Sequence, residues 1–220
     1  MRSSISSILI FVCLSLFAGA EDTETQDPIS RAIAALYTAD YDAFVPPENE
    51  RADALSFIQQ QALAGDGYAL NVMGSINFQG LFGYEVDVVT AEAFFRSSTQ
   101  AEGTRAEAYP YINLAEVLAS NAEIGATSWD EVETIAKQAY AIDPEAPRAA
   151  TLLGLSRLLG TAFEAPMPEI EALLLQGLLT APSDMRQVWF LARGYENGWF
   201  GDPDTAAACD YFETASKAAM

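Results

Sequence analysis

Three arginines and one tryptophan in the last third of the chain could bind a ligand, and three of these four residues are at helical spacing. Arg148 lies 38 residues before Arg186, and Trp189 and Arg193 follow Arg186 after three and seven residues. Residues three, four and seven positions apart share one face of a helix. A guanidinium binds a carboxylate through two parallel hydrogen bonds, and an exposed tryptophan offers an apolar anchor. The pattern therefore predicts a surface for an acidic peptide or a C-terminal carboxylate.

Equivalent positions earlier in the chain extend this surface into a stripe. Counted from a recurring leucine or methionine, positions −5, −2 and +2 share a helical face, and Glu116 occupies one of them. The alternative interpretation is that the arginines neutralise the chain's own excess of acid. We take the following as candidate partner-binding residues: Tyr68, Asn71, Tyr109, Arg148, Thr151, Arg186, Trp189 and Arg193.

Catalytic and metal-binding chemistry has few candidate residues. The sequence contains no histidine, which removes the commonest general base, the Ser-His-Asp and Cys-His systems and nearly every zinc site. Asp202 and Asp204 are spaced like calcium ligands, but the glycine and glutamate of a calcium loop are not in register, so we expect Asp204 to cap a helix. Acidic pairs such as Glu131 and Glu133 are expected by chance among 31 acidic residues. We predict no catalytic residue, no metal and no cofactor.

The overall composition is acidic but also apolar. The 220 residues include 11 Lys and Arg against 31 Asp and Glu, a net charge of −20, and half of them are hydrophobic. Such a chain has enough apolar residues to form a core. Its negative charge repels nucleic-acid phosphates. Nucleic acid is therefore excluded as an expected partner.

The first twenty residues have the pattern of a cleaved signal peptide. Arg2 supplies a positive start, residues 8–17 form an apolar stretch, and residues 18–20 (Ala-Gly-Ala) fit a cleavage site. The apolar stretch is too short to span a bilayer. We expect cleavage after Ala20, no membrane insertion afterwards, and a periplasmic or secreted protein.

Cys209 is the one cysteine left after this cleavage, so we expect no intramolecular disulfide. It follows three alanines, and this setting favours a buried small hydrophobic residue. A reactive thiol or an intermolecular bridge is the alternative.

An internal repeat places these residues. One pattern begins at residues 73, 114, 153 and 191. It consists of a large apolar residue, a Gly or Ala directly after it, and a Gly or Asn seven positions after the first residue. The intervals are 41, 39 and 38 residues, and a degenerate copy begins near Leu36. A second pattern of Asp, Ala, an aromatic pair and a small residue begins at Asp87 and recurs 117 residues later at Asp204. Each unit predicts two helices, the first ending at Gly or Asn.

The repeat predicts an all-α protein of about five helix-turn-helix units. Small residues such as Gly74 let a neighbouring helix approach closely, and aromatic pairs such as Phe94-Phe95 fill the space between units. Residues 21–66 are expected to form a degenerate first repeat or an N-terminal cap, and residues 67–220 the repeat domain. The expected helices are 29–44, 49–64, 67–80, 88–102, 105–120, 129–142, 145–160, 168–180, 184–198 and 204–218.

The repeat units resemble a known family. Residues 191–198, followed by Asp204, Ala208 and the aromatic pair at 211–212, resemble a Sel1-like repeat, and so do residues 73–103. Residues 136–154 are more similar to a tetratricopeptide repeat. The resemblance implies an α/α solenoid, a right-handed superhelix whose concave groove binds proteins or peptides.

We therefore expect an exported, non-catalytic adaptor or scaffold that holds a protein or peptide in its groove. One alternative is a carboxylate-dependent hydrolase, which requires a pKa-perturbed acid pair in a closed pocket. Another is a structural module of a cell-envelope complex, which requires exposed apolar surface at residues 29–36 or near the C-terminus.

Overall fold

The computed structural model describes residues 28–37, 48–160, 167–182 and 184–218. These residues form ten α-helices and no strand, which confirms the all-α prediction. The expected signal peptide lies outside the described residues. The helices are α1 (Pro28–Tyr37), α2 (Glu48–Leu63), α3 (Gly67–Gln79), α4 (Val88–Gln100), α5 (Ala108–Glu123), α6 (Trp129–Ile142), α7 (Ala149–Leu159), α8 (Met167–Thr180), α9 (Met185–Asn197) and α10 (Thr205–Ala218).

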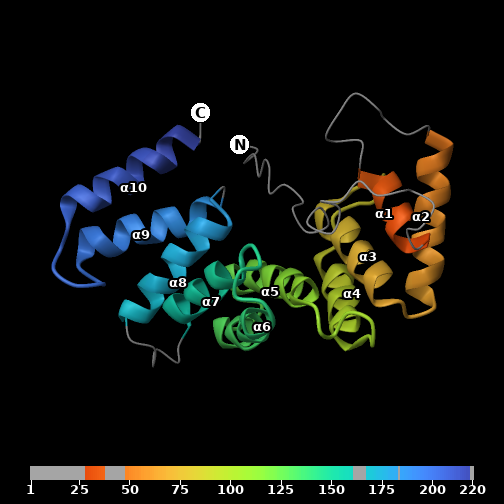
Figure 1. The fold of residues 1–220 in the computed structure, drawn as a ribbon, viewed down its shortest axis with the longest axis horizontal. Coiled ribbons are helices and arrows are strands. Elements are labelled where there is room, and N and C mark those ends of the chain that lie inside the picture. The colour runs from red at the N-terminus through yellow and green to blue at the C-terminus, as the bar shows by residue number, and fades with distance from the viewer. Residues whose placement is uncertain (1–27, 38–47, 161–166, 183, 219–220) are drawn as a thin grey trace.

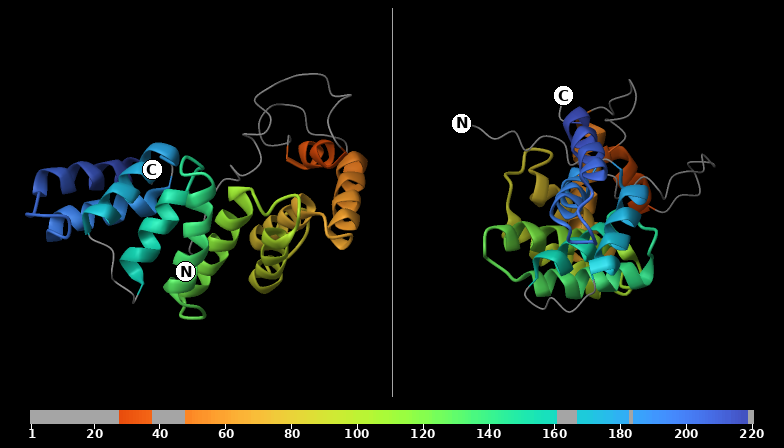
Figure 2. Two further views of the ribbon diagram at one scale, coloured as in Figure 1. Left: turned by 60° about the horizontal axis from the view of Figure 1, so that its bottom comes forward. Right: turned by 90° about the vertical axis from the view of Figure 1, so that its left-hand side faces the viewer.

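The helices stack in chain order as a curved array of pairs. Each described helix packs against the next one, and α3 with α4, α5 with α6, and α9 with α10 form the closest pairs. Figure 1 shows the array bending, with α1 and α2 at one end and α9 and α10 at the other. The left view of Figure 2 shows the same stack as an elongated body. The described helices form five pairs, as the repeat predicts. The assignment of residues 21–66 as a repeat or a cap stays a prediction.

The first helices of successive pairs lie on the inner side of the curve. Helix α3 contacts α1 and α5, and α5 also contacts α7, although each of these helices is two elements away in the chain. No comparable contact joins the second helices, α4, α6, α8 and α10, within the described part of the chain. Because α1, α3, α5 and α7 approach one another and Arg186 of α9 reaches Glu116 of α5, we call the surface of α3, α5, α7 and α9 the inner face. The surface of α4, α6, α8 and α10 is the outer face.

Glycine allows the close packing that the repeat requires. A Cβ atom added at Gly74 would lie 2.5 Å from Phe95 Cε1, and one added at Gly194 would lie 2.0 Å from Phe200 Cε2. Phe95 is almost completely buried in the central core, and Phe200 packs against the C-terminal core. The small residue and the aromatic ring therefore fit together, as the sequence predicts for Gly74.

Most helix ends follow the expected capping residues, but α5 continues past the expected end at Asn121 to Glu123. Gly80 and Gly198 end α3 and α9 with φ angles of 68° and 69°, the left-handed conformation that glycine adopts without steric cost. Asp87 begins α4 by accepting a hydrogen bond from Thr90 N at 3.0 Å. Asp204 accepts one from Ala207 N at 3.0 Å, which confirms its predicted capping role.

Two predicted helix starts are wrong. Helix α5 begins at residue 108 and not 105, because the buried Thr104 hydroxyl donates to Ser98 O at 2.6 Å and holds the preceding residues in turns. Helix α7 begins at residue 149 and not 145, because Arg148 adopts a left-handed φ of 74° that a helix interior cannot accommodate. Expected helix residues 38–44 lie outside the described residues.

Among the described helices, none combines the length and the apolar composition that crossing a membrane requires. Cys209 on α10 is exposed, so the expectation of a buried cysteine is wrong. The cause is the helical register, because Ala208, and not Cys209, occupies the position that packs inward.

Candidate functional site

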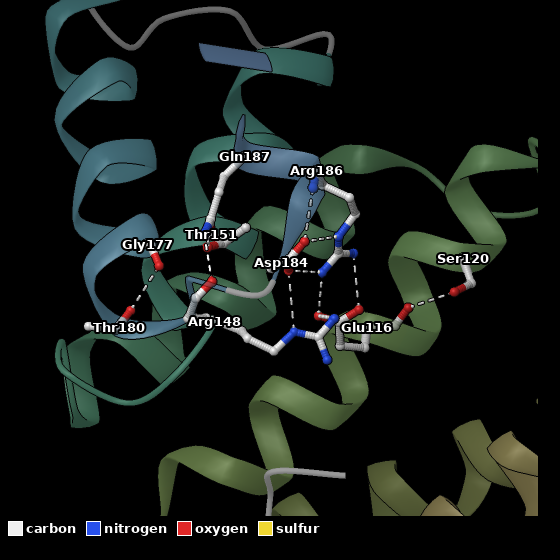
Figure 3. A network of polar contacts seen from close by, with 10 residues as sticks. Glu116, Ser120, Arg148, Thr151, Gly177, Thr180, Asp184, Arg186 and Gln187 are labelled. Carbon is white, nitrogen blue, oxygen red and sulfur yellow. Dashed lines mark hydrogen bonds and ion pairs between the residues drawn. The ribbon is translucent and has the colours of Figure 1, made fainter. Parts of the chain in front are cut away.

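Two carboxylates and two guanidiniums meet where α5, α7 and α9 come together (Figure 3). Arg186 of α9 binds Glu116 of α5 through two hydrogen bonds, Nη1 to Oε2 at 3.1 Å and Nη2 to Oε1 at 2.9 Å. Arg186 also donates to Asp184, from Nε to Oδ1 at 3.0 Å and from Nη2 to Oδ2 at 2.6 Å. One guanidinium thus holds two carboxylates.

Arg148 binds the same two carboxylates from the start of α7. Its Nη2 lies 2.6 Å from Glu116 Oε1, and its Nε lies 3.4 Å from Asp184 Oδ2. The carboxylate side chains of Glu116 and Asp184 are each 9% exposed, against 17% for Arg148 and 28% for Arg186. We call these four residues the inner-face ion cluster. Two positive and two negative charges make it electrically neutral.

The charges in the inner-face ion cluster stabilise one another. Burial alone would lower the pKa of Arg186, but the charge of Glu116 and the hydrogen bond and charge of Asp184 outweigh it and raise that pKa. Burial alone would raise the pKa of Asp184, but the hydrogen bond and charge of Arg186 and the charge of Arg148 lower it. The Arg186–Asp184 pair is therefore ionised at neutral pH.

Local backbone structure positions these side chains. Asp184 caps the N-terminus of α9 and accepts a hydrogen bond from Arg186 N at 3.1 Å. Arg148 precedes α7 in the left-handed conformation, which costs a non-glycine residue about 1–2 kcal/mol. The ion pairs of Arg148 offset part of that cost.

A second, uncharged network ties α7, α8 and α9 together beside the cluster. Thr151 donates its hydroxyl to Gln187 Oε1, and Gln187 Nε2 donates to Ala181 O at 2.7 Å. Thr151 and Gln187 are fully buried. A Cβ atom added at Gly177 of α8 would lie 2.2 Å from Thr151 Oγ1, so the helices leave no room for one. The predicted residue Thr151 therefore links helices within the protein.

Trp189 and Arg193 are the predicted residues that remain open to solvent on α9. Trp189 is 48% exposed, and its ring meets Phe190 edge-on at 4.8 Å. The Arg193 guanidinium lies 5.9 Å from the centre of the Trp189 ring and pairs with Glu196 one turn away. The Arg193 and Glu196 side chains are 41% and 44% exposed, so this ion pair is a surface contact.

The remaining predicted residues lie at the other half of the inner face. Asn71 of α3 is buried and accepts a hydrogen bond from Asn113 Nδ2 of α5 at 2.9 Å. Tyr68 on α3 is 36% exposed, and Tyr109 on α5 is half-buried. The structure thus brings Arg148, Thr151 and Arg186 together near α9, whereas Tyr68 and Asn71 lie on α3 and Tyr109 lies on α5.

The sequence did not identify the carboxylate partners of the arginines. Glu116 was visible as a member of the stripe, but its contact with Arg186 spans 70 residues. Asp184 follows the general signal of an N-cap, an aspartate directly before a helix. In the described chain, no three His, Cys, Asp or Glu side chains are grouped to hold a metal ion.

The stacking of the helices in successive pairs, and the contacts between those pairs, define the chain as an all-α helical-repeat protein. A Sel1 repeat protein from Oxalobacter formigenes superposes with a TM-score of 0.63 and 16% identity, covering 87% of this chain and 71% of that one. The structure of MamA superposes with a TM-score of 0.52 and 14% identity, covering 88% and 95%. A MamA RS-1 double mutant superposes with a TM-score of 0.52 and 16% identity, covering 76% of this chain and 84% of that one.

The protein therefore has a Sel1/tetratricopeptide-like helical repeat fold, and the resemblance predicted from the sequence is confirmed at the level of fold. No protein-family model matches the sequence, and no curated protein matches it significantly.

Proposed function

We propose that the protein is a non-catalytic scaffold that binds a protein or peptide partner on its inner face. The observation that carries the proposal is Trp189, a large aromatic side chain left 48% exposed on the helix that also bears Arg193. Exposed tryptophan and arginine are the residues that most often dominate binding energy at protein interfaces. Helical-repeat folds also present preformed surfaces that bind proteins without large rearrangement.

Arg193 is the arginine best placed to meet a partner's carboxylate. Arg148 and Arg186 are held by Glu116 and Asp184 inside a neutral cluster, so a partner would have to displace a buried internal carboxylate to reach them. Arg193 has a single exposed carboxylate, Glu196, beside it. The partner we propose places an apolar side chain against Trp189 and an acidic group or C-terminal carboxylate against Arg193.

The charge arrangement favours binding over the hydrolase alternative. A carboxylate that donates a proton at neutral pH needs a raised pKa. The pKa of Asp184 is lowered instead, because Arg186 and Arg148 outweigh the effect of burial. The envelope-module alternative expects exposed apolar surface at residues 29–36 or near the C-terminus, and in the first of these segments Ile33 and Leu36 are buried.

We also propose that this scaffold acts outside the cytoplasm, in a periplasm or as a secreted protein. The support is the sequence of residues 1–20, with its positive start, apolar stretch and Ala-Gly-Ala end. Fractionation of cells and N-terminal sequencing of the protein test this proposal. Recovery in the periplasm or medium with Glu21 as the first residue supports it, and recovery in the cytoplasm with Met1 contradicts it.

Site-specific photo-crosslinking tests the binding surface. Benzoyl-phenylalanine replaces Trp189 in one variant and Val89 in a control, because Val89 is 81% exposed on α4 of the outer face. We expect a discrete protein adduct from position 189 and not from position 89. In the same assay Arg193→Glu should abolish the adduct, whereas Arg105→Glu, an equal charge change at an exposed residue outside the helices, should not. Equal adducts from both positions, or none from position 189, would refute the proposal.

A further inference from the structure

The outer face carries a cleft that the proposed scaffold function does not use. It has a volume of about 340 Å³ and lies between α6 and α8, with α7 beneath. Leu153 of α7 and Leu173 of α8 form an apolar floor. Because the outer helices diverge along the curve, α6 and α8 do not pack on each other as α6 and α7 do. The cleft follows from the curvature of the stack.

Hydrogen bonds and ion pairs brace the cleft at both ends. At one end Tyr140 of α6 donates to Gln176 Oε1 of α8 at 2.8 Å, and Gln176 Nε2 donates to Pro144 O at 2.8 Å. At the other end Arg157 Nε lies 3.1 Å from Glu133 Oε1, and Arg157 Nη1 lies 2.5 Å from Glu169 Oε1. The cleft is therefore held open by contacts made within the protein itself.

Lys137 brings to the cleft a charged group that is engaged in no ion pair with a described residue, whereas Arg157 is held by Glu133 and Glu169. Lys137 lines the cleft from α6 and is exposed. Acidic residues outnumber basic ones by 31 to 11 in this chain, and each described arginine of α7 and α9 has a carboxylate partner. An unpaired ammonium beside an apolar floor is complementary to an acidic ligand with an apolar group.

Leu179 extends the apolar surface beyond the cleft. It is 84% exposed and follows the cleft residues Ala172 and Gln176 along one face of α8, at spacings of four and three residues. Leu179 thus presents an apolar side chain about one helical turn, or roughly 5 Å, past the cleft. A ligand that fills the cleft and covers Leu179 must be longer than one side chain, which favours a peptide segment.

We propose that the α6–α8 cleft is a second docking site, which binds an acidic segment of a partner protein. The segment inserts a leucine-sized side chain above Leu153 and Leu173, covers Leu179 and sets an aspartate or glutamate against Lys137. This site lies on the outer face, so it is independent of Trp189. The two sites together would let the scaffold hold two partners, or two parts of one partner, at once.

Peptide selection on the purified full chain tests the cleft. A phage-displayed random dodecapeptide library is depleted on an Ala172→Trp variant, whose indole fills the cleft mouth, and then selected on the wild type. We expect enriched peptides with an apolar residue flanked by Asp or Glu. Binding of the synthesised peptides, measured by fluorescence polarisation, should weaken at least about tenfold in Lys137→Glu and in Leu179→Asp.

Matched controls keep this test decisive. Arg105→Glu makes a similar charge change at an exposed loop residue, and Leu63→Asp alters a leucine that is 90% exposed on α2. Both should bind the peptides within about twofold of the wild type, and circular dichroism should show all variants folded. Trp189→Ala should also leave the affinity unchanged, so failure of the inner-face proposal and failure of this one are distinguishable.

Three outcomes would overturn the proposal. These are no enrichment after depletion, enrichment of peptides without acidic residues, and affinities that Lys137→Glu does not change. Concentration-dependent dimerisation of the wild type that Lys137→Glu abolishes would assign the cleft to a second copy of this acidic chain, and would equally overturn the assignment to a partner protein.

Discussion

Arg186 of α9 forms a two-pronged ion pair with Glu116 of α5, 70 residues earlier in the chain. The contact joins the third helical pair to the fifth. In a helical-repeat protein most contacts join neighbouring units, so a contact two units away fixes the curvature between them. Arg148, just before α7, binds the same carboxylate and ties the intervening unit into this arrangement.

Removal of the shared carboxylate should destabilise the protein strongly. In Glu116→Ala, Arg148 and Arg186 lose one of their two shared partners, and Asp184 alone faces two largely buried guanidiniums. Breaking a buried ion pair on one side costs about 3–5 kcal/mol, and we expect about 3 kcal/mol because Arg186 retains some solvent contact. Urea unfolding followed by circular dichroism measures the change in the free energy of unfolding.

The matched control for this prediction is Glu145→Ala, at an exposed glutamate in the loop before α7. We expect a change below about 0.5 kcal/mol there. If Glu116→Ala also changes stability by less than about 0.5 kcal/mol, the cluster does not hold the third, fourth and fifth pairs together.

Stability should fall in acid through Asp184. Its pKa in the folded protein is lowered from the ordinary value of 3.8, so its contribution to stability is fully present above that value. The contribution is lost as the pH falls below 3.8 through the lower folded pKa. Asp184→Asn should therefore lower stability at neutral pH and flatten the dependence of stability on pH between roughly 4 and 2.

Urea titrations at a series of pH values measure the slope of stability against pH in the wild type and in Asp184→Asn. Asp202→Asn, at an exposed aspartate in the loop before α10, serves as the control and should keep the wild-type slope. A slope in Asp184→Asn equal to that of the wild type would show that other carboxyl groups cause the acid sensitivity.

Cys209 should react with thiol reagents in the folded protein. Its side chain is exposed on α10. In a Cys13→Ser background, Ellman's reagent should modify one thiol per chain in native buffer, at a rate within about tenfold of that in urea. Modification that requires denaturant would place the side chain inside the fold, as the sequence first suggested.

The sequence predicted the helices well because each repeat carries local signals. The glycines at the ends of α3, α7 and α9, and the aspartates before α4 and α10, act over a few residues. Asn121 did not end α5 as expected, because that helix continues to Glu123. The starts of α5 and α7 were misplaced because tertiary contacts decide them. Thr104 bonds back to Ser98, and Arg148 turns left-handed where it meets Glu116 and Asp184.

Only part of the candidate site could be predicted, because the sequence carries local signals but not the contacts between distant helices. Helical spacing placed Arg186, Trp189 and Arg193 on one stripe, and periodicity alone is enough for that. It does not tell which side chains meet across helices, because the superhelix sets the distance between α5 and α9. The pairing of Glu116 with Arg186 therefore required the three-dimensional structure, and so did the cleft beside Lys137.

The packing of α7, α8 and α9 predicts that Gly177 tolerates no side chain. Alanine normally stabilises a helix interior by about 1 kcal/mol relative to glycine. A Cβ atom at Gly177, however, would lie 2.2 Å from Thr151 Oγ1, 2.8 Å from Gln187 Oε1 and 3.1 Å from Thr151 N. We expect Gly177→Ala to destabilise the protein by about 1–3 kcal/mol, because the clash includes backbone and a fully buried hydrogen bond.

Two further variants decide whether this clash is the cause. Gly103→Ala is the control, because its Cβ would meet only Tyr68 Cε2 at 3.9 Å, an ordinary contact, and it should cost less than about 0.5 kcal/mol. Thr151→Ala removes the nearest clashing atom, so the double variant should be more stable than the sum of the single changes predicts. Strict additivity in urea unfolding would mean that Gly177 and Thr151 do not meet. In that case the close approach of α7 and α8 beside the inner-face ion cluster would be wrong.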